Sequence, residues 1–235
     1  MLKHAVLAAA LFGASAAPVL AQTPKVEVSV IYGFTFSDGV SGNNVVAGDG
    51  NIYNRLDPKD GGSLGLSVGF HVTENAEIGF MYAHQTSKLV AGGTRERELG
   101  DLGVSSYHGY FGYNFAPNDS HMVPFIYGGL GATNFSSVDT TTGPIAAPSA
   151  TRTIPGETQF STTWGGGVKF FPAPHIGIRV VGSFTPTYIK SDAAGWWCDP
   201  YWGCVPAGNT QYSNQFEFSG GLSFRFEPEP EPLEK

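Results

Sequence analysis

Residues 26–36 read Val-Glu-Val-Ser-Val-Ile-Tyr-Gly-Phe-Thr-Phe, and this stretch decides the fold. Large apolar side chains stand at every even position from Val26 to Phe36, whereas the odd positions carry mainly small or polar residues. Successive side chains of a β-strand point to opposite faces, so the stretch predicts a strand with one apolar and one polar face. The apolar face requires an apolar environment, and the rest of the sequence indicates which one.

The same alternation recurs about eight times along the chain. It predicts strands at about 26–36, 63–72, 77–83, 106–115, 123–134, 160–171, 176–181 and 212–226. The register of 123–134 and of 160–171 stays open, because both segments are rich in glycine. A chain of 235 residues is too short for two comfortable domains, so we expect a single all-β domain.

The connections between the predicted strands alternate in length. Long connections at 37–62, 88–103, 135–159 and 190–210 take turns with short ones at 73–75, 116–122 and 172–175. Barrels of bacterial outer membranes have this arrangement, with long extracellular loops and short periplasmic turns. A sandwich or a soluble barrel has no physical reason to sort its loops by end. The predicted fold class is therefore an eight-stranded antiparallel up-and-down transmembrane β-barrel.

Composition favours a membrane-embedded barrel over a soluble one. Charged residues make up 14% of the chain, against about 25% in soluble domains. An exported lipocalin-like barrel, the main alternative, would show water a surface dense in Lys and Glu. Here the polar strand faces consist mainly of Gly, Ser, Ala and Thr, which suits a crowded lumen. The formal net charge of −7 argues against nucleic acid as a partner.

The two termini read as separate segments. A short polar start, an apolar run over 5–16 and Val19-Leu20-Ala21 predict a signal peptide at 1–21, with cleavage after Ala21. The apolar run is shorter than the ~20 residues of a membrane helix, which argues against an anchor. The barrel is expected over 22–226. The Glu/Pro-rich residues 227–235 are expected to form a stiff, solvated periplasmic tail.

The end of the last predicted strand carries the most specific motif. Residues 219–226 read Ser-Gly-Gly-Leu-Ser-Phe-Arg-Phe, in which Ser219, Gly221, Phe224 and Phe226 match a barrel-insertion signal. With the loop pattern and the signal peptide, the chain resembles small outer-membrane β-barrel proteins of the OmpA/OmpX or opacity-protein type. The resemblance implies location in the bacterial outer membrane. It also implies two partners, the barrel-insertion machinery and outer-membrane lipid with lipopolysaccharide. This architecture carries adhesins, plugs, narrow channels and a few lipid enzymes, so it leaves the function open.

Charged residues on the polar faces are predicted to point into the lumen: Glu27, Glu77, Lys169, Arg179, Glu217 and Arg225. Charges removed from water must be paired and hydrogen-bonded. Glu27 and Arg225 should lie close together, because the first and last strands pair when the barrel closes. This charge network is either a gate or a structural plug. An eight-stranded interior is just wide enough for side chains to fill it, which favours the plug.

The last long connection contains the only two cysteines of the sequence, Cys198 and Cys204. In an oxidising exported location a disulfide between them is expected. The same connection contains the aromatic residues Trp196, Trp197, Tyr201 and Trp202. They form either a recognition surface exposed on the loop or a group that packs together or sits at the membrane interface. The sequence leaves these alternatives open.

No arrangement of catalytic or metal-binding residues stands out, so we expect no enzyme activity, no cofactor and no metal. His84 resembles the histidine of lipid A deacylases, but Thr86 stands two positions later in place of serine and no acidic partner can be assigned. Residues 95–98, Arg-Glu-Arg-Glu, are expected at a solvated loop tip.

The sequence therefore predicts a structural or surface-recognition barrel of the adhesin-like kind, whose lumen is plugged by the charge network. A monomer is favoured, and the sequence does not name the host or surface ligand. A narrow passive channel for small solutes is the alternative. A lipid-modifying enzyme ranks third.

Overall fold

The computed structural model describes residues 26–46, 51–117, 120–140, 152–189, 198–199, 203–204 and 211–226. Eight long strands form the wall of a barrel: β1 (Val26–Ser37), β4 (Gly61–His71), β5 (Ala76–Gly93), β6 (Arg97–Asn114), β7 (Met122–Phe135), β10 (Glu157–Phe170), β11 (Ile176–Ile189) and β14 (Gln211–Phe226). Six short strands lie outside this wall: β2 (Val40–Val46), β3 (Ile52–Pro58), β8 (Val138–Thr140), β9 (Arg152–Ile154), β12 (Cys198–Asp199) and β13 (Gly203–Cys204). Among these residues we find no helix that is long and apolar enough to cross a membrane.

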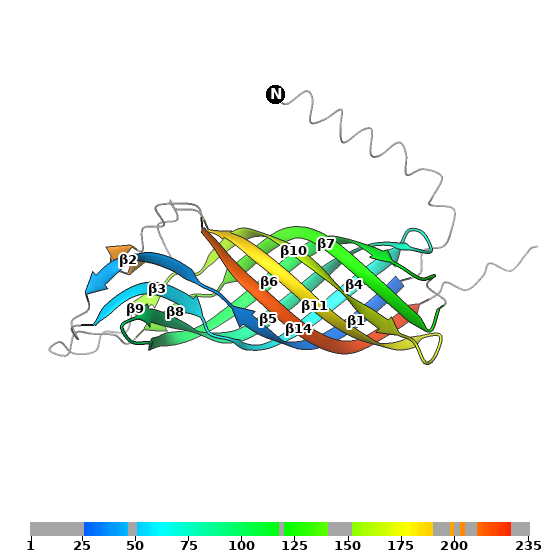
Figure 1. The fold of residues 1–235 in the computed structure, drawn as a ribbon, viewed down its shortest axis with the longest axis horizontal. Helices are drawn as coiled ribbons and strands as arrows, with labels where there is room; N and C mark the ends of the chain where they lie inside the picture. Colours follow the sequence, from blue (N-terminus) through cyan, green and yellow to red (C-terminus); the bar gives the residue numbers. More distant parts are fainter. Residues whose placement is uncertain are drawn as a thin grey trace, which may run out of the picture.

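The eight long strands close into one antiparallel barrel (Figure 1). Each pairs with its neighbours in the order β1–β4–β5–β6–β7–β10–β11–β14, and β14 returns to β1. The closing pair keeps one register from Val26 opposite Phe226 to Ser37 opposite Gln215. A closed wall has no open edge, which is what a lipid environment requires of a β-structure. The predicted fold class is confirmed.

The two faces of the wall differ as the alternation predicted. The outer face exposes aromatic and aliphatic side chains, of which Tyr32 and Phe218 are each 68% exposed. The inner face is polar and packed: Ser29 and Ser223 are fully buried, and 2.8 Å separates their hydroxyl oxygens. An apolar outer belt around a polar interior is the pattern of a barrel embedded in lipid.

The packing at the closing pair explains one glycine of the predicted insertion signal. A Cβ atom at Gly221 would lie 2.0 Å from the backbone oxygen of Val30 on β1. Close packing therefore requires glycine where β14 approaches β1, independently of any recognition of this motif by the insertion machinery. Of the other motif residues, Phe226 is exposed on the outer face and Ser219 is buried.

On the extracellular side, β5 and β6 continue beyond the apolar belt. They pair from Ala76 opposite Tyr113 up to Ala91 opposite Arg97. The long connection predicted at 88–103 is therefore wrong, because residues 94–96 alone join the two strands. The charged residues of this segment suggested a loop, but a strand outside the membrane can show a polar face to water.

A hairpin of β2 and β3 extends the wall further, within the connection predicted at 37–62. β3 pairs with the upper part of β5, from Pro58 opposite Leu89 to Tyr53 opposite Gly93, and β2 pairs with β3. Figure 1 shows these strands beyond one end of the barrel, together with β8 and β9. We call the upper parts of β5 and β6, with β2 and β3, the extracellular sheet.

Several predicted features fall outside the described residues. These are the signal peptide at 1–21, the tail at 227–235 and the aromatic residues Trp196, Trp197, Tyr201 and Trp202. The short strands β12 and β13 place Cys198 directly opposite Cys204. Opposite residues of antiparallel strands have Cα atoms about 4.5–5.5 Å apart, a separation that a disulfide spans. The disulfide itself stays a prediction.

Candidate functional site

Four of the predicted lumen charges meet near the periplasmic end of the barrel. Glu27 on β1, Glu77 on β5, Lys169 on β10 and Arg225 on β14 are all buried. Lys169 Nζ lies 2.9 Å from Glu27 Oε1 and 2.7 Å from Glu77 Oε2. Arg225 Nε lies 3.3 Å from Glu27 Oε2. We call these residues the basal network. Its two acids and two cations balance, which limits the cost of burying them.

The strand register dictates these contacts. Glu27 stands opposite Arg225 in the closing pair, so both side chains leave the wall at the same level. Lys169 comes from β10, on another part of the wall, and reaches both carboxylates across the bore. An eight-stranded barrel is narrow enough for side chains from different walls to meet in this way.

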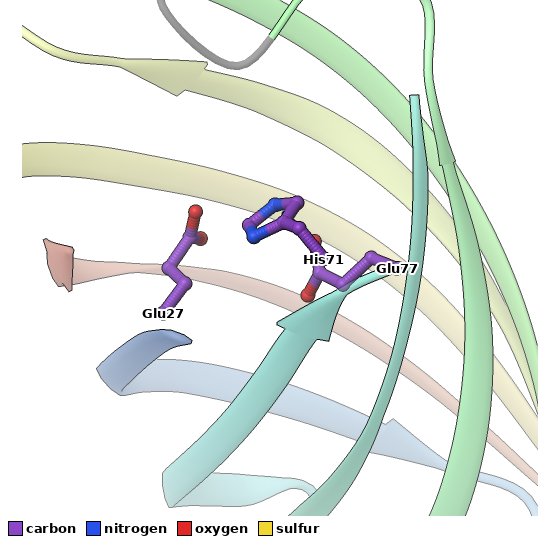
Figure 2. Close-up of side chains that lie close together, drawn as sticks. All are labelled: Glu27, His71 and Glu77. Carbon is purple, nitrogen blue, oxygen red and sulfur yellow. The ribbon is translucent and has the colours of Figure 1, made fainter. Parts of the chain in front are cut away.

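Two further residues surround Glu77. His71 Nε2 lies 3.3 Å from Glu77 Oε2, and the Tyr110 hydroxyl donates a hydrogen bond to Glu77 Oε1. Sequence reasoning did not include either residue in the site, although His71 stands opposite Glu77 in the register of β4 and β5. Figure 2 shows Glu27, His71 and Glu77 close together in the lumen.

This grouping has the composition of a metal site. One ligand atom from each of Glu27, His71 and Glu77 lies within 4.8 Å of the others, and carboxylates and imidazoles bind divalent ions. The ammonium group of Lys169, however, already contacts both carboxylates. A metal ion would have to displace this cation and would add charge to a balanced network. We therefore assign the cluster to ion pairing.

Aromatic rings cover the cations of the lower lumen. The guanidinium carbon of Arg225 lies 3.4 Å from the ring centroid of Phe171, and that of Arg179 lies 4.5 Å from the ring centroid of Phe125. Lys169 Nζ lies 5.2 Å from the same Phe125 centroid. The electron-rich ring faces attract these cations where water is scarce.

Arg179 and Glu217, the other two predicted lumen charges, stay outside the basal network. Arg179 on β11 is 2% exposed, and its Nη1 donates a hydrogen bond of 3.3 Å to Ser67 Oγ. Glu217 on β14 accepts hydrogen bonds at Oε2 from Ser63 Oγ, at 2.5 Å, and from Thr35 Oγ1, at 3.1 Å. Within the described ranges, neither has an oppositely charged group within 4.0 Å.

A cavity of about 80 Å³ occupies the lumen above the basal network, and both Arg179 and Glu217 line it. We call it the lumen chamber. Much of its wall is apolar and includes Ile31, Met81 and Val181, and hydroxyl and amide side chains line the rest beside the two charged groups. One water molecule needs about 10–15 Å³ of such volume, so the chamber has room for several.

The extracellular end of the lumen is filled by buried apolar side chains that sequence reasoning missed. They are Val40, Leu89, Leu102, Val104, Phe135, Val138, Ile154 and Ile189, and we call them the apical cluster. Most of them lie in segments that the sequence predicted as connections. A segment interpreted as a loop carries no expectation of which way its side chains point, so the alternation could not identify this cluster.

His84 lies beside a serine of the neighbouring strand. Its Nδ1 lies 2.9 Å from Ser105 Oγ on the neighbouring strand β6. Within the part of the chain that the structure describes, no carboxylate lies within 4.0 Å of its ring nitrogens. A Ser–His pair acts as nucleophile and base when a third group, usually a carboxylate, orients the histidine, and the described residues place no carboxylate in that position.

Glu98, from the predicted loop tip, lies on β6 and is exposed between two lysines. Lys88 Nζ is 2.7 Å from Glu98 Oε2, and Lys59 Nζ is 2.9 Å from Glu98 Oε1. The hydrogen bonds from Lys88 and Lys59 lower the pKa of the Glu98 carboxyl to about 2. These ion pairs join β5, β6 and the turn after β3 on the water-facing side of the extracellular sheet.

Comparison with known proteins agrees with this architecture. The family model described as outer membrane protein beta-barrel domain matches residues 5–226. Among solved structures, the chain is similar to the outer membrane protein OprG from Pseudomonas aeruginosa, with 12% identity and a TM-score of 0.61, over 88% of this chain and 98% of that one. It is also similar to Neisserial surface protein A, with 13% identity and a TM-score of 0.50, over 87% and 98% respectively. These likenesses concern the fold alone. No curated protein matches the sequence.

Proposed function

This chain belongs to the family of outer membrane protein β-barrel domains, and from that membership we propose that it is a non-enzymatic, plugged barrel with a surface-recognition role. The protein resides in the bacterial outer membrane, where short turns face the periplasm and longer segments face outward. We further propose that the apolar belt contacts outer-membrane lipid and lipopolysaccharide. The barrel-insertion machinery is proposed to read residues 219–226.

Both ends of the lumen support the plug. At the periplasmic end, Lys169 is 1% exposed and pairs with carboxylates from two strands. At the extracellular end, Leu89 and Phe135 of the apical cluster are buried as completely as residues of a soluble core. Paired charges on one side and packed apolar side chains on the other leave little room for a continuous column of water.

The extracellular sheet supports the recognition role. Among the described residues, β2 pairs with β3 on one side and has no strand on the other. Its sequence, Val-Ser-Gly-Asn-Asn-Val-Val, contains none of the charged or proline residues with which proteins usually protect an edge strand. An extended segment of a partner protein could therefore add to this edge through backbone hydrogen bonds.

A narrow channel is the second candidate, and the lumen chamber favours it. Because a cavity already occupies the middle of the bore, a solute would have to open a path only through the two ends of the lumen. A channel of this kind would conduct when the basal network and the apical cluster move apart. A plug would not conduct.

Planar-bilayer recording separates the plug from the channel. We expect the folded wild-type protein to give no steady conductance. Arg225→Ala leaves the Glu27 carboxylate with one cation fewer and should produce a measurable leak. Large, stable single-channel currents from the wild type would overturn the plug in favour of the channel.

Adhesion tests the recognition role. Bacteria that display the wild-type protein should adhere to cultured epithelial cells more strongly than bacteria with residues 39–58 replaced by a short turn. Glu98→Gln, on the same sheet but away from the β2 edge, serves as the matched control and should adhere like the wild type. Folding of the shortened variant is checked on a denaturing gel, where boiled and unboiled samples of a folded barrel migrate differently. Equal adhesion of a folded shortened variant would contradict a role for this hairpin.

A further inference from the structure

The lumen contains two opposite charges that line one cavity without pairing. Elsewhere in the lower lumen, acids and cations are in contact: Glu27 touches Lys169 and Arg225, and Glu77 touches Lys169. Arg179 and Glu217 both line the lumen chamber, yet no ion pair joins them. The register of β11 and β14 explains the separation, because Ser183 rather than Arg179 stands opposite Glu217. Four residues along a strand correspond to about 13 Å.

Arg179 presents unused donors to the chamber. Its side chain is almost fully buried and rests over the ring of Phe125. Nη1 donates to Ser67 Oγ at 3.3 Å, whereas Nε has no hydrogen-bond partner. Glu77 is near enough to interact with Arg179 electrostatically, but no carboxylate of the described residues is in direct contact with the guanidinium, whose charge and free donor have lost water. An anion or a carboxylate in the chamber would satisfy both.

Glu217 presents the complementary charge from the other strand. Ser63 and Thr35 donate to the same oxygen, Oε2, and hold the carboxylate in place. No cation of the described chain is within 4.0 Å. A ligand ammonium group would complete its hydrogen bonding as Lys169 does for the carboxylates below.

From these contacts we propose that the lumen chamber binds a small zwitterionic solute, whose carboxylate pairs with Arg179 and whose ammonium group pairs with Glu217. A simple anion would satisfy Arg179 but would meet the negative charge of Glu217, and a simple cation would have the reverse problem. A molecule with both groups neutralises both ends of the chamber.

The size of the chamber limits the solute. Its volume of about 80 Å³ corresponds to about five to eight water-sized groups, so the ligand has about that many non-hydrogen atoms. Glycine and the smallest other α-amino acids are of this size. The apolar part of the wall, at Ile31, Met81 and Val181, accepts a methyl group and leaves no room for a large side chain.

Equilibrium dialysis with radioactive glycine tests the proposal on the full chain, folded in a non-ionic detergent. Because the proposed plug would slow entry into the lumen, the protein is refolded in the presence of glycine and then dialysed against it. We expect saturable binding of one glycine per barrel. Acetate and methylammonium, which carry one charge each, should compete at least about tenfold more weakly, since each forgoes one charged hydrogen-bonded contact.

Two variants locate the site. Arg179→Gln and Glu217→Gln should each weaken glycine binding about tenfold or more. Ser29→Ala, which alters a lumen residue outside the chamber, is the matched control and should bind like the wild type. The difference in gel migration between boiled and unboiled samples verifies that each variant is folded. If Arg179→Gln does not fold, Arg179→Lys, which keeps the charge, and Glu217→Gln decide the question.

Three results would each overturn the zwitterion site. They are the lack of saturable glycine binding, acetate binding as tight as glycine binding, and Gln variants that bind glycine like the wild type. A water-filled chamber would give the first result. None of these results bears on the proposed recognition role, which is measured by adhesion and concerns the opposite end of the molecule.

Discussion

The periplasmic and extracellular ends of the lumen are filled by opposite chemistries. The basal network closes one end with buried ions, and the apical cluster fills the other with aliphatic and aromatic side chains. The difference follows the surroundings of the wall. Where lipid covers the outside, the apolar residues face outward and polar residues are left for the lumen. Where water covers the outside, the same strands turn their apolar residues inward, as in a soluble protein.

Strand β5 shows this inversion within one element. In the belt, Phe80 is exposed to the outside and Glu77 is buried in the lumen. In the extracellular sheet, Lys88 is exposed while its neighbour Leu89 is fully buried. The backbone pairing with β6 continues through both parts. The environment, rather than the secondary structure, therefore decides which face carries the apolar residues.

The largest effect is expected from Lys169→Ala at the basal end. The change leaves Glu27 and Glu77 buried with one shared cation fewer and close to each other. Stranding buried charges costs about 3–5 kcal/mol of unfolding free energy, which urea unfolding in detergent measures. Lys88→Ala removes an exposed lysine that also pairs with an acid, and it should change stability little. Equal effects of the two changes would mean that the basal ion pairs are not sealed from water.

At the apical end, Leu102→Ala should lower the unfolding free energy by about 3 kcal/mol. The change removes a fully buried aliphatic side chain and leaves a cavity. Leu102→Met, which keeps the volume, should cost less than about 1.5 kcal/mol. Because no charge is involved, the loss should not depend on ionic strength. A neutral Leu102→Ala would show that the apical cluster is loosely packed.

A double-mutant cycle tests whether Glu27 and Arg225 stabilise the basal end as a pair. Each single change to alanine removes one partner, and the double change removes both. We expect the double variant to be milder than the sum of the singles by about 0.5–3 kcal/mol, as for residues in direct contact. Strict additivity in urea unfolding would mean that the pair, separated by 3.3 Å, does not act as one unit.

The smallest effect concerns the ion pairs on the exposed face of the extracellular sheet. Lys88 and Lys59 hold the pKa of Glu98 at about 2, below its ordinary value of 4.5. The carboxylate therefore stabilises the folded sheet above pH 4.5, and this contribution is lost as the pH falls toward 2. Amide hydrogen exchange at the top of β5 and β6 should become faster over that range in the wild type. In Glu98→Gln it should depend less on pH, and high salt should reduce the difference.

The sequence predicted the membrane-embedded part of the fold well. There, alternation alone determines which side chains face lipid, and Glu27, Glu77, Lys169, Arg179 and Arg225 are all buried on the inner face. It also predicted that Glu27 and Arg225 lie close together, but not that Lys169 contacts Glu27 and Glu77. The contact of Lys169 with two carboxylates crosses the bore and depends on the stagger of the strands, which a period of two does not encode.

The extracellular part was less predictable for a different reason. Residues 88–103 mix charged and apolar residues. Because the sequence does not show whether water, lipid or the lumen borders each face, this pattern is interpreted as a loop. Leu102 and Val104, which flank Gly103, carry the alternation of a strand with its apolar face turned inward. His71 was also missed, because a lone histidine on a polar face gives no sign of the carboxylate opposite it in the register.

The closing pair of β1 and β14 has a consequence for how the protein is made. Glu27 and Arg225 are separated by 198 positions in the chain, so β1 cannot pair with β14 until all the strands between them have been made. Bringing such distant segments together is slow, because the entropy of closing the loop is lost before the contacts form. During that delay the future lipid-facing side chains are in water and prone to aggregate. Biogenesis thus depends on holding an unfinished chain soluble in the periplasm until its last strand arrives.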